Sequence, residues 1–268
     1  SRLLVQCPES DLLAMPFRLA AWGIGIRTPC AARVLCIGFL GGFAPAASAA
    51  AQAVRTGQLT VEEADALLPA CICSGPSFVV LTVGQSLLGS AELGVLLFAS
   101  QITANYLTAA LLNRFAGVRS VKPGSAAPAS PAPLRLDEIL ADAAITYCKL
   151  CGFILFFRML AAGAGTLLPA GAGTLCAVLL EVCSGCDLAS RTGRWGSLLC
   201  CAALSVQGLS VLLQVRTICP PEMTLRPLYR SRLLHLPLSL ALFYLLLPGG
   251  EADVFSTLPA RVLLMRRG

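Results

Sequence analysis

Charged residues are scarce in this sequence. Only 13% of the 268 residues are Asp, Glu, Lys or Arg, whereas a soluble domain carries roughly 25%. Hydrophobic residues make up 56%, and the mean hydropathy is +0.78. This deficit excludes a soluble globular protein, because too few polar side chains are present to cover its surface. A lipid bilayer accepts apolar surface, so the composition predicts an integral membrane protein.

Regular alternation of polar and apolar residues is also lacking, which excludes the strands of a transmembrane barrel. The apolar runs are instead continuous, as in residues 75–112 and 233–247. The predicted fold class is therefore all-α: a polytopic helical membrane protein with two repeat-like halves, broken helices and re-entrant hairpins. The 24 Gly and 17 Pro are compatible with this class, since both residues are tolerated at packed or broken points of membrane helices.

Histidine and recognisable catalytic motifs are nearly absent. The chain has one histidine, His235, and neither an H-E-x-x-H nor a G-x-S-x-G motif. Carboxylates at a spacing useful for acid–base chemistry are missing as well. We therefore expect a protein that is not an enzyme and that needs no cofactor.

Cysteine is abundant, with 13 residues that include the C-x-x-C pairs Cys148/Cys151 and Cys183/Cys186. A single histidine leaves a Cys/His zinc site few ligands, and the flanking residues are apolar. We expect these cysteines to pack as small apolar residues, with a metal or disulfide role as the alternative. The net charge of +6 suits anionic lipid headgroups. Basic residues are never interleaved with aromatics, so no nucleic-acid partner is expected.

The distribution of apolar runs divides the chain into five parts. Because it begins at Ser1 without Met or a signal segment, we expect upstream helices to be missing. The five parts are an interfacial or re-entrant segment (1–28), a first membrane half (29–112), a basic Pro/Ala/Ser linker (113–135), a second membrane half (136–248) and a C-terminal tail (249–268).

Each half contains two apolar segments that Gly, Pro or polar residues interrupt. In the first half these are residues 41–47 and 74–78, and in the second half residues 181–186 and 207–214. Unwound backbone inside a membrane is tolerated only where it is buried in protein or lines a cavity. Paired interruptions of this kind indicate the binding site of a transporter.

The candidate solute-binding residues lie at these interruptions. A carboxylate at Glu181 within an apolar run is unfavourable unless it meets a cation, a proton or a ligand; the alternative is an interfacial cap or structural pair. Ser210 and Gln214 share a face if their segment is helical, and interhelical hydrogen bonding is an equal alternative for them. The full predicted set is Gly42, Pro45, Ser74, Gly75, Pro76, Glu181, Ser184, Gly185, Gln207, Gly208, Ser210 and Gln214.

Three further local patterns give predictions. Thr60 and Glu63 have the spacing of a capping box, which predicts a helix start. Asp142 and Lys149 are seven residues apart and so lie near one helical face, as a pair or with Lys149 extended towards the interface. His235, beside Arg232, is expected to be interfacial or structural.

The motifs around the interruptions carry a family resemblance. Residues 38–47 (GFLGGFAPAA), 73–84 (CSGPSFVVLTVG) and 88–94 (LGSAELG), with Glu62-Glu63-Ala64, resemble the YlbJ-type sporulation integral membrane proteins. Residues 180–185 (LEVCSG), 204–215 (LSVQGLSVLLQV) and 225–234 (LRPLYRSRLL) resemble the same family in the same order. The family carries a nucleoside-recognition (Gate) domain, which is similar to parts of concentrative nucleoside transporters.

The resemblance implies a helical protein of the bacterial cell membrane that is needed for endospore formation, with re-entrant hairpins and unwound helices. Two positions depart from the family pattern. Cys71, Ile72 and Cys73 stand where members carry Asn, and Leu212 stands where members carry His. A proton-coupling role of that histidine therefore does not transfer to this chain.

We expect a multi-pass transporter or permease-like protein for a small polar solute, a nucleoside or an ion. The alternative is a non-transporting membrane factor for assembly of the spore envelope or cortex. The expected partners are membrane lipid and a polar solute or coupling ion, and association into a homo-oligomer stays open.

Overall fold

Helices are the only regular secondary structure within residues 10–117 and 136–247, the part of the chain that this computed structural model describes. The first half contains α2 (Ser10–Gly23), α3 (Pro29–Gly41), α4 (Phe43–Arg55), α5 (Val61–Cys71), the π-helix η1 (Ser77–Leu87) and α6 (Ala91–Ala116). The second contains α7 (Leu136–Leu167), α8 (Ala170–Leu180), α9 (Val182–Ser190), the short η2 (Gly193–Trp195), α10 (Gly196–Val206), α11 (Gly208–Ile218) and α12 (Arg226–Leu246). The all-α class is confirmed for these residues.

Sequence signals account for several helix ends. Thr60 and Glu63 form the predicted capping box at the start of α5, with each side chain bonded to the other residue's backbone N–H. Ser90 caps α6 by accepting a hydrogen bond from Leu93 N. Gly117, with φ of 62°, ends α6 in the left-handed conformation that glycine adopts without strain.

The predicted interruptions are real but shorter than expected. Gly42 alone separates α3 from α4, and residues 72–75 separate α5 from η1. Glu181 separates α8 from α9, and α10 ends at the left-handed Gln207. One to four residues with non-helical dihedrals are enough to redirect a helix axis, so the residues around each break return to helical geometry.

Five predicted site residues therefore lie on helices and not on unwound backbone. Pro45 stands in the first turn of α4, where its missing N–H removes no intrahelical hydrogen bond. Ser184 and Gly185 belong to α9, and Ser210 and Gln214 belong to α11. The predicted breaks over residues 181–186 and 207–214 were too long for this reason.

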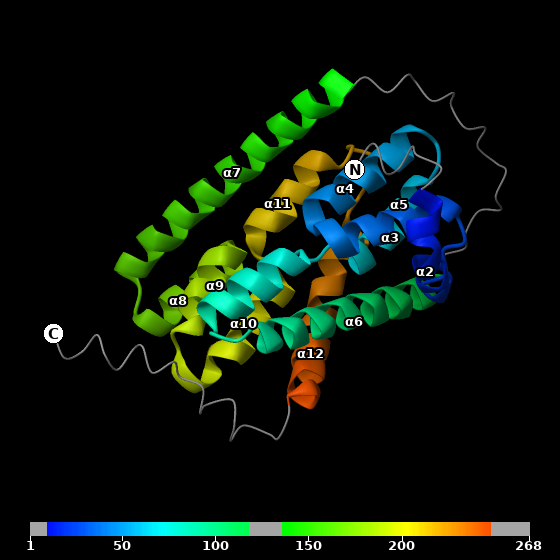
Figure 1. Cartoon of the computed structure of the whole chain (residues 1–268). Helices are drawn as coiled ribbons and strands as arrows, with labels where there is room; N and C mark the ends of the chain where they lie inside the picture. The colour runs from blue at the N-terminus through cyan, green and yellow to red at the C-terminus, as the bar shows by residue number, and fades with distance from the viewer. Residues whose placement is uncertain (1–9, 118–135, 248–268) are drawn as a thin grey trace.

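A similar order of helices occurs in residues 29–116 and in residues 170–246. Two pairs of short helices, each interrupted by a break, precede one long helix: α3–α4 and α5–η1 before α6, and α8–α9 and α10–α11 before α12. The long helices α6 and α12 pack on each other, α12 also packs on α5, and α6 also packs on α10. Figure 1 shows α6 and α12 crossing at the middle of the molecule.

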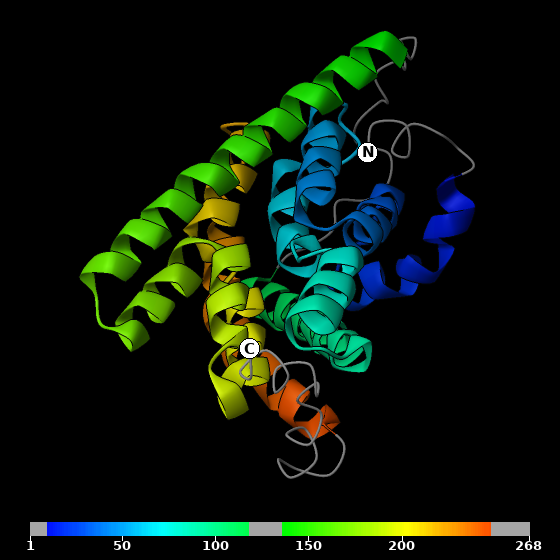
Figure 2. The ribbon, with the colours of Figure 1, turned by 60° about the vertical axis from the view of Figure 1, so that its left-hand side comes forward.

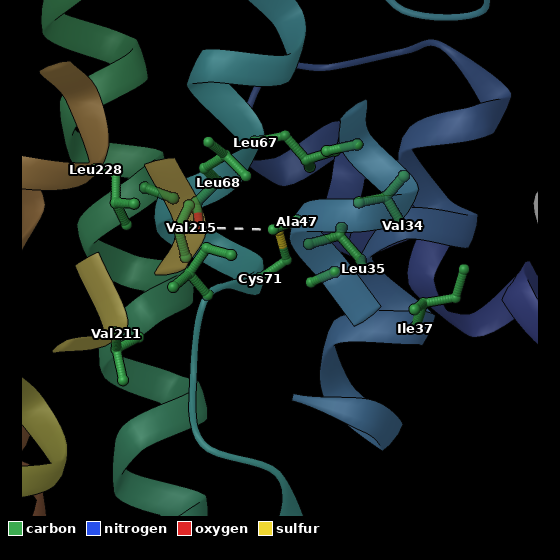
Figure 3. Packing of buried hydrophobic residues seen from close by; sticks show 14 of the residues in the cluster. Val34, Leu35, Ile37, Ala47, Leu67, Leu68, Cys71, Val211, Val215 and Leu228 are labelled. Atoms are coloured by element: carbon green, nitrogen blue, oxygen red, sulfur yellow. Dashed lines mark hydrogen bonds between the residues drawn. The ribbon is translucent and has the colours of Figure 1, made fainter. Parts of the chain in front are cut away.

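Small side chains and glycine allow these helices to approach closely. Seven alanines of α4 are buried, together with alanines and cysteines of α3, α5 and α10. Figure 3 shows Val211 and Val215 of α11 in the same core cluster as Leu67 and Leu68 of α5, and α11 packs on α4, although these helices are far apart in the sequence. The core is therefore shared between the halves. Small residues at helix interfaces are typical of membrane proteins.

The long helix α7 lies along one flank of the molecule (Figures 1 and 2). Most of its surface is exposed, including Leu155, Phe156 and Met159. It runs through the Gly- and Ala-rich residues up to Leu167, and only Leu168 and Pro169 separate it from α8. Apolar outer surface of this kind suits contact with lipid.

Three helical stretches in the described part of the chain are long and apolar enough to cross a membrane: Ala91–Ala116, Leu140–Leu167 and Gly193–Ile218. The third includes the break at Gln207. The expected span at residues 233–247 is not among them, because α12 carries Arg226, Arg230 and Arg232 near its start. The predicted linker (113–135) begins too early, because residues 113–116 belong to α6; its residues 118–135 and the predicted tail (249–268) lie outside the described residues.

Replacing Gly84 with alanine is expected to destabilise the protein. The new Cβ would lie 2.5 Å from the Cα of Gly94 and 2.9 Å from the carbonyl oxygen of Ser90, so the backbones of η1 and α6 must separate. Overpacking of this kind costs roughly 1–3 kcal/mol. The melting temperature of the detergent-purified variant measures the effect.

The matched control is Gly152→Ala in α7, where an added Cβ meets nothing within 4 Å. Alanine favours a helix over glycine by about 1 kcal/mol, so this variant is expected to be neutral or stabilised. Equal melting temperatures for the two variants would contradict the close crossing of η1 and α6.

Candidate functional site

The two breaks of the first half touch each other. Gly42 has φ of 80°, and a Cβ at this position would lie 2.8 Å from the backbone nitrogen of Gly75 and 3.3 Å from the carbonyl oxygen of Cys73. Both the dihedral angle and the space therefore require glycine. The α3–α4 break and the α5–η1 break form one backbone contact, flanked by the predicted site residues Ser74 and Pro76.

The two breaks of the second half touch in the same way. Gly208 has φ of 69°, and a Cβ there would lie 2.9 Å from the backbone nitrogen of Glu181 and from the carbonyl oxygen of Leu180. Gln207, immediately before it, is left-handed with φ of 61°. A left-handed non-glycine residue is strained, and such strain gathers at functional sites.

A hydrogen bond joins the two pairs of breaks. Gln207 Nε2 donates to the carbonyl oxygen of Ile72 at 3.2 Å, across 135 residues of sequence. Ile72 is the residue at which α5 ends. The fold thus brings the four predicted interruptions into one connected set, which we call the break cluster: Gly42, residues 72–75, Glu181, and Gln207 with Gly208.

Glu181 is the N-cap of α9. Its carboxylate accepts hydrogen bonds from Cys183 N at 2.8 Å and from Ser184 N at 2.7 Å, and the residue is only 1% exposed. A carboxylate at a helix N-terminus is stabilised by the free N–H groups and by the helix dipole. The geometry is therefore that of the capping alternative, with the carboxylate buried within the protein.

Three buried side-chain oxygens of the predicted site have no hydrogen-bond partner: Ser184 Oγ, Gln207 Oε1 and Gln214 Oε1. Gln214 Nε2 donates to Ser210 Oγ at 2.9 Å, which confirms that these two residues share a helical face. Buried polar atoms are nearly always paired, and leaving one unpaired costs about 1–3 kcal/mol. A polar ligand with N–H or O–H groups could donate the hydrogen bonds that these three oxygens lack.

A polar interface between α6 and α12 was not predicted as a site. Its buried members are Gln101 and Asn105 on α6, and Arg232, His235 and Ser239 on α12. On each helix these residues recur every three or four positions, which is the signature of one face. That spacing, within otherwise apolar helices, is the signal that could have identified them.

Arg232 and Asn105 connect this interface to the break cluster. Arg232 Nη2 donates to Asn105 Oδ1 at 3.2 Å, and Asn105 Nδ2 donates to the carbonyl oxygen of Ile72 at 3.4 Å. Arg232 Nη1 donates to the carbonyl oxygen of Ser205, two residues before the break at Gln207, at 3.5 Å. One guanidinium therefore reaches towards the ends of α5 and α10.

The remaining members of the interface are also hydrogen-bonded. Gln101 Nε2 donates to Ser205 Oγ at 3.0 Å, and Ser205 Oγ bonds Ser239 Oγ. His235 Nε2 lies 3.2 Å from the carbonyl oxygen of Gln101. His235 is fully buried within the protein, and its hydrogen bond is consistent with the structural role that was one of the two expectations.

A cleft of about 450 Å³ lies between α4, α7 and α11. Arg55, Asp142 and Lys149 line it, and Pro45 is its one member from the predicted site. Asp142 and Lys149 line the same cleft, which confirms that they share a helical face. The break cluster and this cleft are separate features that meet at the first turn of α4.

Several cysteines belong to the apolar core and form no disulfide, among them Cys71, Cys186, Cys200 and Cys201. Packing as small apolar residues is thus observed for these four. Within residues 10–117 and 136–247, no group of three or more His, Cys, Asp or Glu side chains is placed to hold a metal ion.

Comparisons of this chain with family models, with curated proteins and with solved structures find no match. The family resemblance of the motifs therefore stays a prediction.

Asn105→Ala is expected to destabilise the protein by roughly 1–3 kcal/mol, because the guanidinium of Arg232 and the Ile72 carbonyl each lose a buried hydrogen bond. Thr103→Ala, an exposed position of the same helix, should stay within about 0.5 kcal/mol of the parent protein. Chemical unfolding in detergent compares the two. Equal stability of the variants would show that the α6–α12 interface does not hold the break cluster.

Proposed function

We propose that this chain is a transporter or permease-like membrane protein for a small polar solute, which the break cluster binds. The observation that carries the proposal is the contact of four helix breaks, from distant parts of the sequence, at one buried place. Non-helical backbone at membrane depth is tolerated where it is buried in protein or lines a cavity. Discontinuous helices at the interface of two repeats are where secondary transporters bind their solutes.

The order of elements supports the proposal that the two halves are structural repeats. If α4, α5, η1 and α6 correspond to α9, α10, α11 and α12, the contacts between the halves occur in matching pairs. The contact of α5 with α12 matches that of α10 with α6, and the contact of α4 with α11 matches that of α9 with η1. In this arrangement α5–η1 and α10–α11 are the arms of two re-entrant hairpins.

The proposed solute class is supported by one unpaired oxygen in the break cluster, on Gln207, and by two on helices that begin at it, Ser184 on α9 and Gln214 on α11. The unpaired oxygens of Ser184, Gln207 and Gln214 belong to a hydroxyl and two amides, which pair with the N–H and O–H groups of a neutral polar molecule. Nucleosides and nucleobases carry such groups, and the resemblance to nucleoside-recognition proteins points to the same class. That resemblance also supports a bacterial cell-membrane location and a role in sporulation.

A thermal-unfolding screen of the detergent-purified protein against nucleosides and nucleobases tests the proposal. A solute present at 100 times its Kd should stabilise the folded state by about 2.7 kcal/mol. If no solute raises the melting temperature of the folded protein, the proposal is wrong, and the membrane assembly factor becomes the favoured function.

Ser184→Ala separates binding from folding. Because Ser184 Oγ is buried and has no partner, its removal should leave the melting temperature without solute unchanged or raise it, while it reduces the shift produced by solute. Ser190→Ala on the same helix, whose hydroxyl donates to the Asp187 carbonyl, is the control and should keep the full shift. An unchanged shift in Ser184→Ala would remove Ser184 from the site.

Glu181→Gln provides a second test, with a different expectation. The carboxylate caps α9, and an amide can accept only one of the two hydrogen bonds. The variant should therefore lose roughly 1 kcal/mol of stability and also bind the solute more weakly. Binding at the parent affinity in a folded Glu181→Gln protein would limit this residue to its capping role.

A further inference from the structure

Arg232 is a buried cation whose hydrogen-bond partners are all neutral oxygens. The residue is 8% exposed. Its guanidinium donates to Asn105 Oδ1 at 3.2 Å, to Ser231 Oγ at 3.3 Å and to the carbonyl oxygen of Ser205 at 3.5 Å. Among residues 10–117 and 136–247, these three oxygens are its complete set of hydrogen-bond acceptors, and no carboxylate pairs with it. An uncompensated charge in this environment would be strongly unfavourable.

The compensation comes from the ends of two broken helices. The Ser205 carbonyl belongs to the last turn of α10, where the break at Gln207 removes its usual helical N–H partner. Asn105 connects the guanidinium to the carbonyl of Ile72, at the end of α5. A helix C-terminus is equivalent to roughly half a negative charge. Two of them together balance about one cation.

The same surroundings hold coupling ions in transporters of this architecture. Unwound carbonyls and the C-terminal ends of half-helices coordinate Na⁺ or H⁺ near the interface of the repeats. Here α5 and α10 are the corresponding half-helices, and both end beside a side chain that carries its own positive charge. The charge that an exchangeable ion would supply is thus already present.

We propose that the guanidinium of Arg232 is a tethered cation that occupies, at the ends of α5 and α10, the place of an exchangeable Na⁺ or K⁺. The melting temperature of the protein is then independent of Na⁺ and K⁺. Removal of the Arg232 side chain leaves a position where binding of a small cation stabilises the folded protein. Solute binding is also independent of Na⁺ and K⁺; this last statement rests on the proposed function, whereas the ion response of stability does not.

The experiment measures melting temperatures of the detergent-purified full chain in chloride salts of equal ionic strength. The cations are Na⁺, K⁺, N-methylglucamine, which is too large for the site, and guanidinium at low millimolar concentration, far below the molar range in which it denatures. For the parent protein, we expect the same melting temperature in the Na⁺, K⁺ and N-methylglucamine salts. A higher melting temperature in Na⁺ or K⁺ would overturn the proposal.

Arg232→Ala is expected to melt roughly 5–10 °C lower in the N-methylglucamine salt. Na⁺, K⁺ or guanidinium should restore part of this loss by entering the vacated position. Arg230→Ala, an exposed arginine of the same helix, is the control and should show neither effect. An Arg232→Ala protein that is equally unstable in all four salts would show that the side chain acts only through packing and hydrogen bonds, which also overturns the proposal.

If Arg232→Ala does not fold, Arg232→Lys and Arg232→Gln decide the matter. Lysine keeps the charge, and glutamine keeps the hydrogen-bond donors without the charge. The tethered cation predicts that Arg232→Lys melts higher than Arg232→Gln, and the opposite order overturns it. None of these melting temperatures requires a solute. A negative solute screen therefore does not contradict the proposal for Arg232, and a negative result for Arg232 does not contradict the proposed solute binding.

Discussion

The burial of a guanidinium between two broken helices is the constraint on which the rest of the structure depends. Among residues 10–117 and 136–247 no carboxylate pairs with Arg232; its guanidinium donates to the Ser205 carbonyl at the end of α10 and to Asn105, which in turn donates to the Ile72 carbonyl at the end of α5. Those carbonyls are free because the helices stop at Ile72 and Gln207. The breaks and the buried cation therefore stabilise one another, and neither would be favourable alone in an apolar protein.

Close packing makes this arrangement possible. Backbone can meet backbone at Gly42 with Gly75, and at Gly208 with Glu181, because glycine leaves room for the contact. The alanines of α4 and the cysteines around them fill the surrounding core without large side chains. Small residues bring the ends of helices close enough for side chains such as Gln207 and Asn105 to bridge them.

Much of the fold was predictable because its signals are local. The capping box at Thr60 and the four interruptions are encoded by neighbouring residues, and each is found at or within a few residues of its predicted position. The length of each interruption was not predictable. Propensity indicates where a helix stops, whereas packing decides how soon the next helix begins.

The helical architecture, the apolar helices long enough to cross a membrane and the location of the breaks are predictable from the sequence, because composition and local dihedral preference are properties of short segments. Which breaks touch and which polar groups are shared depends on how the helices pack. No role was assigned to Arg232 or Asn105 from the sequence. Their roles depend on contacts between residues 127 positions apart. The spacing of polar residues can mark one face of each helix. Which faces meet is decided only when the helices pack.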